Sequence, residues 1–412
     1  MLYLIVEVSE NISHKKIEEL IAEAYEERNN NTQKSLALCE EALALSEKIN
    51  YTRGKAQALS QMGFCHVQLA QYDKAIEELH EALKLFSAIG DKQGLANADY
   101  NIGLVFIRMG DFNMALEHEL KSLAFNKELQ NIHAEANCHM QIGYIHEHFS
   151  NADISLAHYE KCLELHQKIN NEGGIASALM GLASVYILKG EHQKVSEYLN
   201  ECIRIRKLIH DPRGYAATLH RYSTYLFQCN NLAESKKVAE EGIEIANNIG
   251  DKMGLVRFYV TLGKIHFTLK DYQAALEILF GGEKLAVEIK LKSVEFEIYQ
   301  GLADVYTALT NYERALHYYK LFHKTKEEVL NSEVAVKIKN VETIRQMETA
   351  NKEAEIHRLK NVELKQANKE IEEKNKEILD SIRYARRIQH SLLPTEYYVA
   401  KSLGRLNKKK TP

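Results

Sequence analysis

Histidines and cysteines are concentrated between residues 133 and 166, where they could form a metal site. The segment contains His133, His139, His146, His148, His158 and His166, together with Cys138 and Cys162. Imidazole and thiolate are common zinc ligands, and imidazoles one or two helical turns apart share a helix face. Such a site would require the surrounding elements to bring these side chains to one point.

The elements around this cluster follow a repeat with a period of about 40 residues, which runs along most of the chain. Small residues recur once per period, and a second, mostly small series follows twelve positions after each of them. The first series comprises Gly63, Gly103, Gly143, Ala183, Ser223, Gly263 and Ala303, and the second Ala75, Ala115, Ser155, Val195, Ser235, Ala275 and Ala315. Self-similarity at such a period is typical of a repeat array.

Each unit predicts two amphipathic helices joined by short turns. In the unit after Gly54, apolar and small residues recur every three or four positions over residues 55–70, and again over residues 75–83. This spacing places them on one face of a helix. Gly90 and Asp91 end the unit, because glycine tolerates the left-handed conformation and aspartate can cap the next helix. Closely crossing helices explain the small series, since larger side chains would push the axes apart.

The repeat register gives the histidines and cysteines structural positions. His146 occupies the repeat position of Phe106 and Tyr186, a half-buried aromatic position of the first helix. Cys162 and Cys202 lie one period apart, at a position that holds small residues in other units. Because side chains at scattered repeat positions rarely converge on one ion, we expect core and surface histidines rather than a metal site, and no cofactor.

Composition and charge favour a helical, non-enzymatic protein. Only three prolines occur in 412 residues, so few residues interrupt helices. The net charge of −4 gives no overall basic field, and nucleic acid is not an expected partner. The sequence contains no GxSxG, HExxH or Walker motif, and we expect no catalytic residues. The apolar run over residues 1–6 is too short for a signal peptide or a membrane span, which predicts a cytoplasmic protein without a membrane partner.

The unit resembles the tetratricopeptide repeat, in the long form of peptide-sensing and scaffold proteins such as MalT, Rap and LGN. The resemblance rests first on the small residues of both helices. An aliphatic residue directly precedes the small residue of the first helix, and an aromatic, histidine or aliphatic residue follows that small residue three positions later. The aliphatic residues are Met62, Ile102, Ile142, Leu182, Leu262 and Leu302. It implies an all-α superhelical solenoid over residues 14–325, with seven to eight helix pairs, one per period, after a leader at residues 1–13. The first unit departs from the pattern, with Glu23 at the glycine position, and we expect a capping repeat there.

The resemblance also implies a concave binding face lined by the first helix of each unit. Carboxamides fall on this face in pairs one turn apart: Gln57 with Gln61, Asn97 with Asn101, and Asn137 with Gln141. An amide side chain both donates and accepts, so this ladder can bind the backbone of an extended peptide. Further along, Arg221, Arg257 and Lys264 could hold a carboxylate from an acidic side chain or a peptide C-terminus. Apolar surface between the rungs comes from Phe64, Ile107, Tyr144, Phe227 and Phe267. The alternative is that these amides only solvate a helix face.

The repeat stops near Lys324, and residues 326–394 are predicted to form one coiled-coil signalling helix. The best heptad frame alternates spacings of four and three over Leu364, Asn368, Ile371, Asn375, Ile378, Ile382, Ala385, Gln389 and Leu392. Asparagine at two equivalent core positions favours a two-stranded, in-register pairing. We therefore expect a parallel homodimer; the alternative is a single solvated helix folded back on the array.

Residues 374–389, together with Leu392, Leu393 and Pro394, resemble the signalling helix that enters a SpoIIE/RsbU-like serine phosphatase domain in bacterial sensors. The resemblance is confined to this short stretch of the chain. Residues 395–412 form a basic tail that we expect to be flexible, and they are too few for a phosphatase domain.

Three functions remain open on this basis. The first is a non-enzymatic scaffold or sensor in bacterial signal transduction, in which the array binds a peptide or protein and the coiled coil dimerises and transmits the event. The second is a regulator that sequesters a response regulator or phosphatase partner. The third is the sensory half of a SpoIIE-like serine phosphatase whose catalytic domain is absent from this chain.

Overall fold

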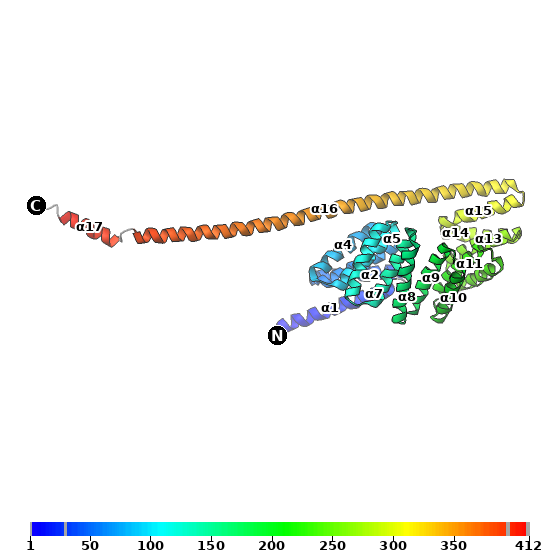
Figure 1. Ribbon diagram of the computed structural model, residues 1–412, viewed down its shortest axis with the longest axis horizontal. Helices are drawn as coiled ribbons and strands as arrows, with labels where there is room; N and C mark the ends of the chain where they lie inside the picture. Colours follow the sequence, from blue (N-terminus) through cyan, green and yellow to red (C-terminus); the bar gives the residue numbers. More distant parts are fainter. Residues whose placement is uncertain (1, 29–30, 393–395, 409–412) are drawn as a thin grey trace. The chain divides into compact units, whose positions relative to one another are not determined.

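The computed structural model describes residues 2–28, 31–392 and 396–408, and every regular element in these segments is an α-helix (Figure 1). The helices are α1 (Leu2–Glu27), α2 (Thr32–Lys48), α3 (Thr52–Gln68), α4 (Tyr72–Ile89), α5 (Lys92–Met109), α6 (Phe112–Glu128), α7 (Ile132–His148), α8 (Ala152–Lys168), α9 (Glu172–Lys189), α10 (His192–Leu208), α11 (Pro212–Gln228), α12 (Leu232–Asn248), α13 (Lys252–Thr268), α14 (Tyr272–Glu288), α15 (Lys292–Ala308), α16 (Tyr312–Leu392) and α17 (Glu396–Lys408). The predicted all-α fold is confirmed. In the part of the chain that is described, no helix combines the length and apolar character needed to cross a bilayer.

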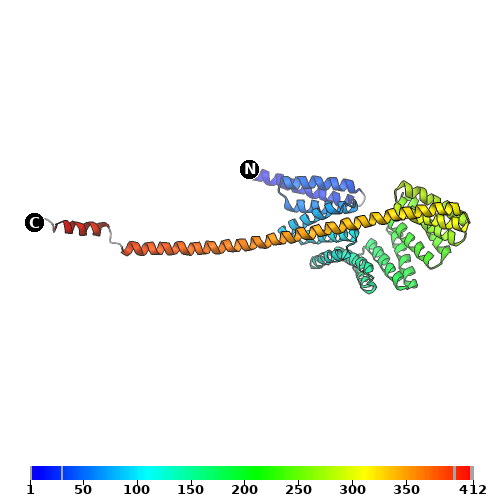
Figure 2. The same ribbon diagram turned by 90° about the horizontal axis from the view of Figure 1, so that it is seen from above.

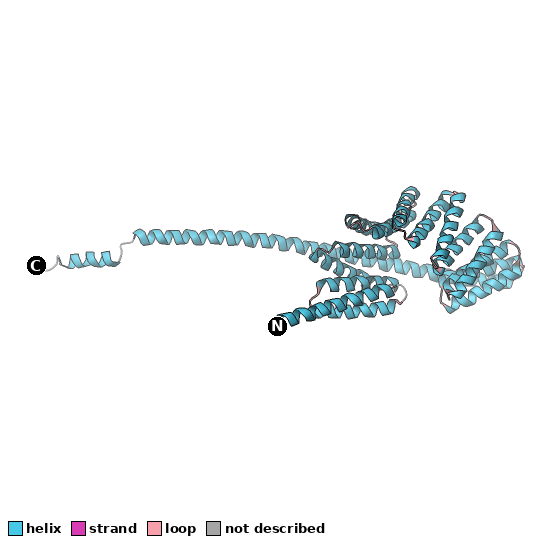
Figure 3. Cartoon of the chain, turned by 90° about the horizontal axis from the view of Figure 1, so that it is seen from below, coloured by secondary structure: helices cyan, strands magenta, loops and turns pink. Residues whose placement is uncertain are grey.

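Consecutive helices form pairs that stack one on the next, as Figures 2 and 3 show. From α3 onward, the first helices of successive pairs begin one period apart, at Thr52, Lys92, Ile132, Glu172, Pro212, Lys252 and Lys292. From α1 to α15, each helix contacts the next one along the chain, within a pair and between pairs. The predicted helical solenoid is therefore confirmed, and its core runs along the stack between neighbouring helices.

A left-handed residue ends the helices of the array once every half period. These residues are Asn50, Ala70, Gly90, Gly110, Gln130, Ser150, Asn170, Gly190, His210, Asn230, Gly250, Lys270, Lys290 and Thr310. Asparagine or aspartate often follows and caps the next helix: the Asp91 Oδ1 accepts a hydrogen bond of 2.9 Å from the backbone N–H of Gly94. The predicted turn at Gly90 and Asp91 is thus confirmed.

Replacing Thr310 by glycine is expected to raise the stability of the array. Thr310 is β-branched and has φ of 59°, a conformation that costs L-residues about 1–2 kcal/mol relative to glycine. We expect the free energy of unfolding to rise by about 1 kcal/mol, measured as a higher urea midpoint. Thr310→Ala is the control, because it removes the branch and keeps the Cβ; an equal gain in both variants would contradict the backbone explanation.

The small residues of the first helices let paired helices approach closely. A Cβ added at Gly63 would lie 2.6 Å from the Leu79 side chain, and one added at Gly263 would lie 2.5 Å from Leu279. Both distances are too short for real contacts, so a side chain here would push the helices apart. This is the packing reason predicted for the small series.

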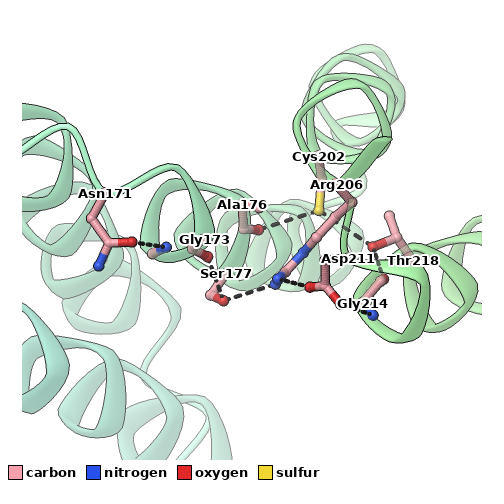
Figure 4. A network of polar contacts seen from close by, with 10 residues as sticks. Asn171, Gly173, Ala176, Ser177, Cys202, Arg206, Asp211, Gly214 and Thr218 are labelled. Atoms are coloured by element: carbon pink, nitrogen blue, oxygen red, sulfur yellow. Dashed lines mark hydrogen bonds and ion pairs between the residues drawn. The ribbon is translucent and has the colours of Figure 1, made fainter. Parts of the chain in front are cut away.

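Cys202 and its neighbours show how polar groups join three successive helices (Figure 4). The Cys202 thiol donates to the carbonyl oxygen of Ala176 at 3.3 Å and also contacts the Thr218 hydroxyl. Beside it, the Arg206 guanidinium bonds the Asp211 carboxylate at 2.5 Å and donates to Ser177 at 2.9 Å. Cys202 is fully buried, as its repeat position predicts.

The chain divides into two compact units, residues 1–338 and 339–412. Helix α16 supplies the last helix of the array and continues to Leu392, so residues 326–392 are helical as predicted. The C-terminal segment, expected to be flexible, contains helix α17, whose Val399 and Leu403 are spaced by one turn. Residues 393–395 and 409–412 lie outside the described residues.

Candidate binding groove

Five of the six predicted amides line one pocket of about 430 Å³, which we call the amide pocket. They are Gln57, Gln61, Asn97, Asn101 and Asn137. Helices α3, α5 and α7 each present these residues from the same repeat positions, because the three helices begin one period apart. The structure therefore brings together side chains that are far apart in the sequence.

The sixth amide supports the pocket wall rather than lining it. The Gln141 Nε2 donates a hydrogen bond of 3.2 Å to the hydroxyl of Tyr100, and Tyr100 lines the pocket. Burial raises the pKa of the Tyr100 hydroxyl, which therefore stays protonated. Gln61 and Asn101 are themselves only 9 % and 8 % exposed, so the protein already shields them from most of the solvent.

Three residues of the pocket, Ile21, Tyr25 and Arg28, come from the first repeat and were not predicted from the sequence. Tyr25 lies in the last turn of α1 and Arg28 directly follows this helix, with the Arg28 guanidinium stacked on the Tyr25 ring at 3.6 Å. The guanidinium carbon also lies 4.6 Å from the centroid of the Phe64 ring, a residue that was predicted to add apolar surface. Arg28 lies one period before Gln68 of the next unit, so extending the repeat register by one period would have aligned it with the first helices.

Two of the three predicted basic residues line a second pocket of about 330 Å³, which we call the arginine pocket. Arg221 and Arg257 share it, and the Arg221 Nη1 donates to the Ser184 hydroxyl at 2.6 Å. Burial, with the nearby arginine charges, lowers the pKa of His220 in this pocket to about 4, so the ring is neutral at pH 7. Lys264 does not line the pocket and forms an ion pair of 2.8 Å with Glu297.

The histidines of residues 133–166 form small contacts within the array. The Nδ1 atoms of His139 and His158 lie 2.9 Å apart, and the His148 ring stacks on Phe112 with centroids 4.3 Å apart. Burial lowers the pKa values of His139, His146 and His158, which keeps these rings uncharged. Within the described residues, no group of three or more His, Cys, Asp or Glu side chains is placed to hold a metal ion.

Sequence comparison assigns most of the groove to known repeats. A tetratricopeptide-repeat profile matches residues 54–128 and 135–207, and a second one matches residues 256–279. The matched residues are tetratricopeptide repeats, and the array has the fold of a tetratricopeptide-like solenoid. No curated protein matches the sequence.

Several solved structures share the fold of this solenoid. The apo form of the quorum sensor NprR from B. thuringiensis is 16% identical, with a TM-score of 0.58 over 79% of this chain and 92% of its own. The apo form of RapI is 16% identical, with a TM-score of 0.54 over 67% of this chain and 99% of its own. The Rap conjugation gene regulator of the plasmid pLS20, in complex with the Phr* peptide, is 14% identical, with a TM-score of 0.51 over 76% of this chain and 96% of its own. At these identities the similarity concerns the fold alone.

Proposed function

We propose that this protein is a non-enzymatic sensor or scaffold whose groove binds an extended peptide or an extended segment of a protein. The observation that carries the proposal is the amide pocket, where five of the six predicted carboxamides, from three successive repeats, meet in one cavity. An extended backbone offers N–H and C=O groups at a regular spacing, and carboxamides can pair with both. The pocket volume lies within the range of about 300–1,000 Å³ that is usual for ligand sites.

Known complexes of similar folds support this proposal. The pLS20 Rap regulator was solved with the Phr* peptide, and another Rap protein, with a TM-score of 0.52, was solved with the Competence and Sporulation Factor. The repeats of this chain form a comparable solenoid. The amide and arginine pockets of this solenoid supply polar groups suited to a peptide.

The seam of α16 would carry the output by pairing two copies in parallel. Leu364, Ile371, Ile378 and Ile382 are between 56% and 60% exposed in the single chain, so the predicted seam is a row of apolar side chains that a second copy could cover. Asn368 and Asn375 are exposed as well, at the positions where amides bond across a two-stranded axis. The side chains of Gln389 and Leu392 lie outside the described part of the chain.

Replacing Gln61 and Asn101 together by alanine is expected to lower peptide binding about tenfold. Each lost hydrogen bond contributes about 0.5–1.5 kcal/mol, and both residues line the amide pocket. The measurement uses the immobilised full chain, a synthetic library of random heptapeptides and quantification of the retained peptides by mass spectrometry. Asn113→Ala is the matched control, because Asn113 is an exposed amide on α6 outside the pocket. Equal retention by all three proteins would show that the amides only solvate the helices.

A further inference from the structure

Three of the four arginines in the two pockets differ from the lysines at the helix ends, because they form no ion pair with a described carboxylate. Lys252, the first residue of α13, bonds Glu288, the last of α14, at 2.6 Å, and equivalent pairs recur in other repeats. By contrast, no carboxylate among the described residues lies within ion-pair distance of Arg28, Arg221 or Arg257. Among the described residues, the two pockets therefore hold three arginines that no carboxylate neutralises at ion-pair distance.

Within the described part of the chain, ring stacking rather than hydrogen bonding holds the Arg28 guanidinium in place. Its guanidinium lies over the rings of Tyr25 and Phe64, with ring centroids 3.6 and 4.6 Å from the central carbon. Stacking covers the faces of the planar guanidinium and orients it. Its N–H groups lie in the plane and therefore remain free of the ring contacts. The Nε atom is buried and has no hydrogen-bond partner among the described residues. A bound carboxylate would satisfy this edge through two parallel N–H···O bonds.

The permanent charges of the amide pocket leave one positive charge in excess. Arg28, Arg53 and Asp91 line it, and the Arg53 Nε lies 3.2 Å from the Asp91 carboxylate. Asp91 also caps α5 by accepting a hydrogen bond from the N–H of Gly94, so its carboxylate is paired within the protein. Arg28 is thus the cation that a ligand meets in this pocket.

The arginine pocket repeats this arrangement further along the groove. Arg221 lies four periods after Gln61, and Arg257 lies five periods after Gln57, so both arginines stand at the repeat positions of the amides. Asp251 lines the same pocket and caps α13 by accepting the N–H of Gly254 at 2.9 Å. Two arginines and one aspartate again leave positive charge in excess.

We propose that the groove selects acidic peptides, and that Arg28 is a carboxylate-binding residue at the α1 end. The inference rests on the proposed peptide binding and adds the class of peptide. The amides would hold the backbone, while Arg28 and the pair Arg221 and Arg257 bind aspartate or glutamate side chains, or the terminal carboxylate. The whole chain carries a net charge of −4, so its overall field does not attract an anionic ligand, and the arginines of the two pockets would supply the attraction locally.

The test is the amino-acid composition of the heptapeptides that the full chain retains from an equimolar random library without cysteine. We expect aspartate and glutamate to be enriched about fivefold over the input, and the enrichment to fall at high salt. Arg28→Gln should lose most of the enrichment, whereas Arg28→Lys should keep part of it, because the charge remains and the planar fork is lost. Lys252→Gln removes one positive charge at a helix end and is the control; circular dichroism checks that every variant folds.

The possible outcomes separate this inference from the proposed function. If no peptide is retained by the wild-type chain, the proposed function itself is wrong. If peptides are retained without acidic enrichment, peptide binding stands and the acidic class is wrong. If the enrichment survives Arg28→Gln, or falls equally in Lys252→Gln, Arg28 is not the carboxylate-binding residue.

Discussion

Replacing Ile371 and Ile378 by glutamate is expected to convert the full chain from a dimer into a monomer at micromolar concentration. Both side chains are 56% exposed in the single chain and stand at core positions of the proposed seam. Pairing would bury them against their counterparts, and an unpaired glutamate at such a position costs several kcal/mol. Light scattering should give twice the mass of one chain for the wild type and the mass of one chain for the variant.

Leu379→Glu is the matched control for this experiment. Leu379 is 54% exposed, adjoins Ile378 on the same helix and lies outside the heptad frame. The control variant should therefore remain a dimer. A monomeric wild type would favour the single solvated helix, and dissociation of the Leu379 variant would show that the seam has another register.

Replacing Glu119 by leucine is expected to stabilise the array by about 2–4 kcal/mol at neutral pH. Glu119 is fully buried on α6, and neither carboxylate oxygen has a hydrogen-bond partner among the described residues. Equivalent repeat positions hold Leu79 and Leu279, which face Gly63 and Gly263 as Glu119 faces Gly103. A leucine would therefore fit the same contact without a buried polar group.

The stability that the Glu119→Leu variant gains over the wild type should increase with pH, because Glu119 is buried. Burial raises the pKa of this carboxyl well above its ordinary value of 4.5, so the folded state favours the protonated form. The wild type therefore loses stability as the pH rises from about 4.5 toward the folded pKa, and the advantage of leucine grows over that range. Urea midpoints between pH 4.5 and 8 measure this difference.

Glu119→Gln separates the charge from the shape of the side chain. The amide is neutral at every pH, so its stability should not follow the wild-type decline, but its polar atoms stay buried and the gain should be smaller than with leucine. A Glu119→Leu variant that is less stable than the wild type at pH 7.5 would mean that the carboxyl has a stabilising partner in solution.

The fold of this chain could be predicted from the sequence because a repeat array is built from local and nearest-neighbour contacts. The spacing of small residues predicted where Gly63 packs on its partner helix, and the Gly90 turn followed from the conformational freedom of glycine. The amide pocket followed as well, since Gln61 and Asn101 keep the same helix face from one repeat to the next.

The sequence alone determined the repeat, its helices and the face that carries the amides, because each depends on residues close together or one period apart. Only the tertiary structure decided which side chains are paired. It placed Lys264 against Glu297, left Arg28 stacked on aromatic rings without a carboxylate, and buried Glu119 without a partner among the described residues. Pairing depends on side-chain reach and on the crossing of helices from different repeats, and residue spacing does not specify either.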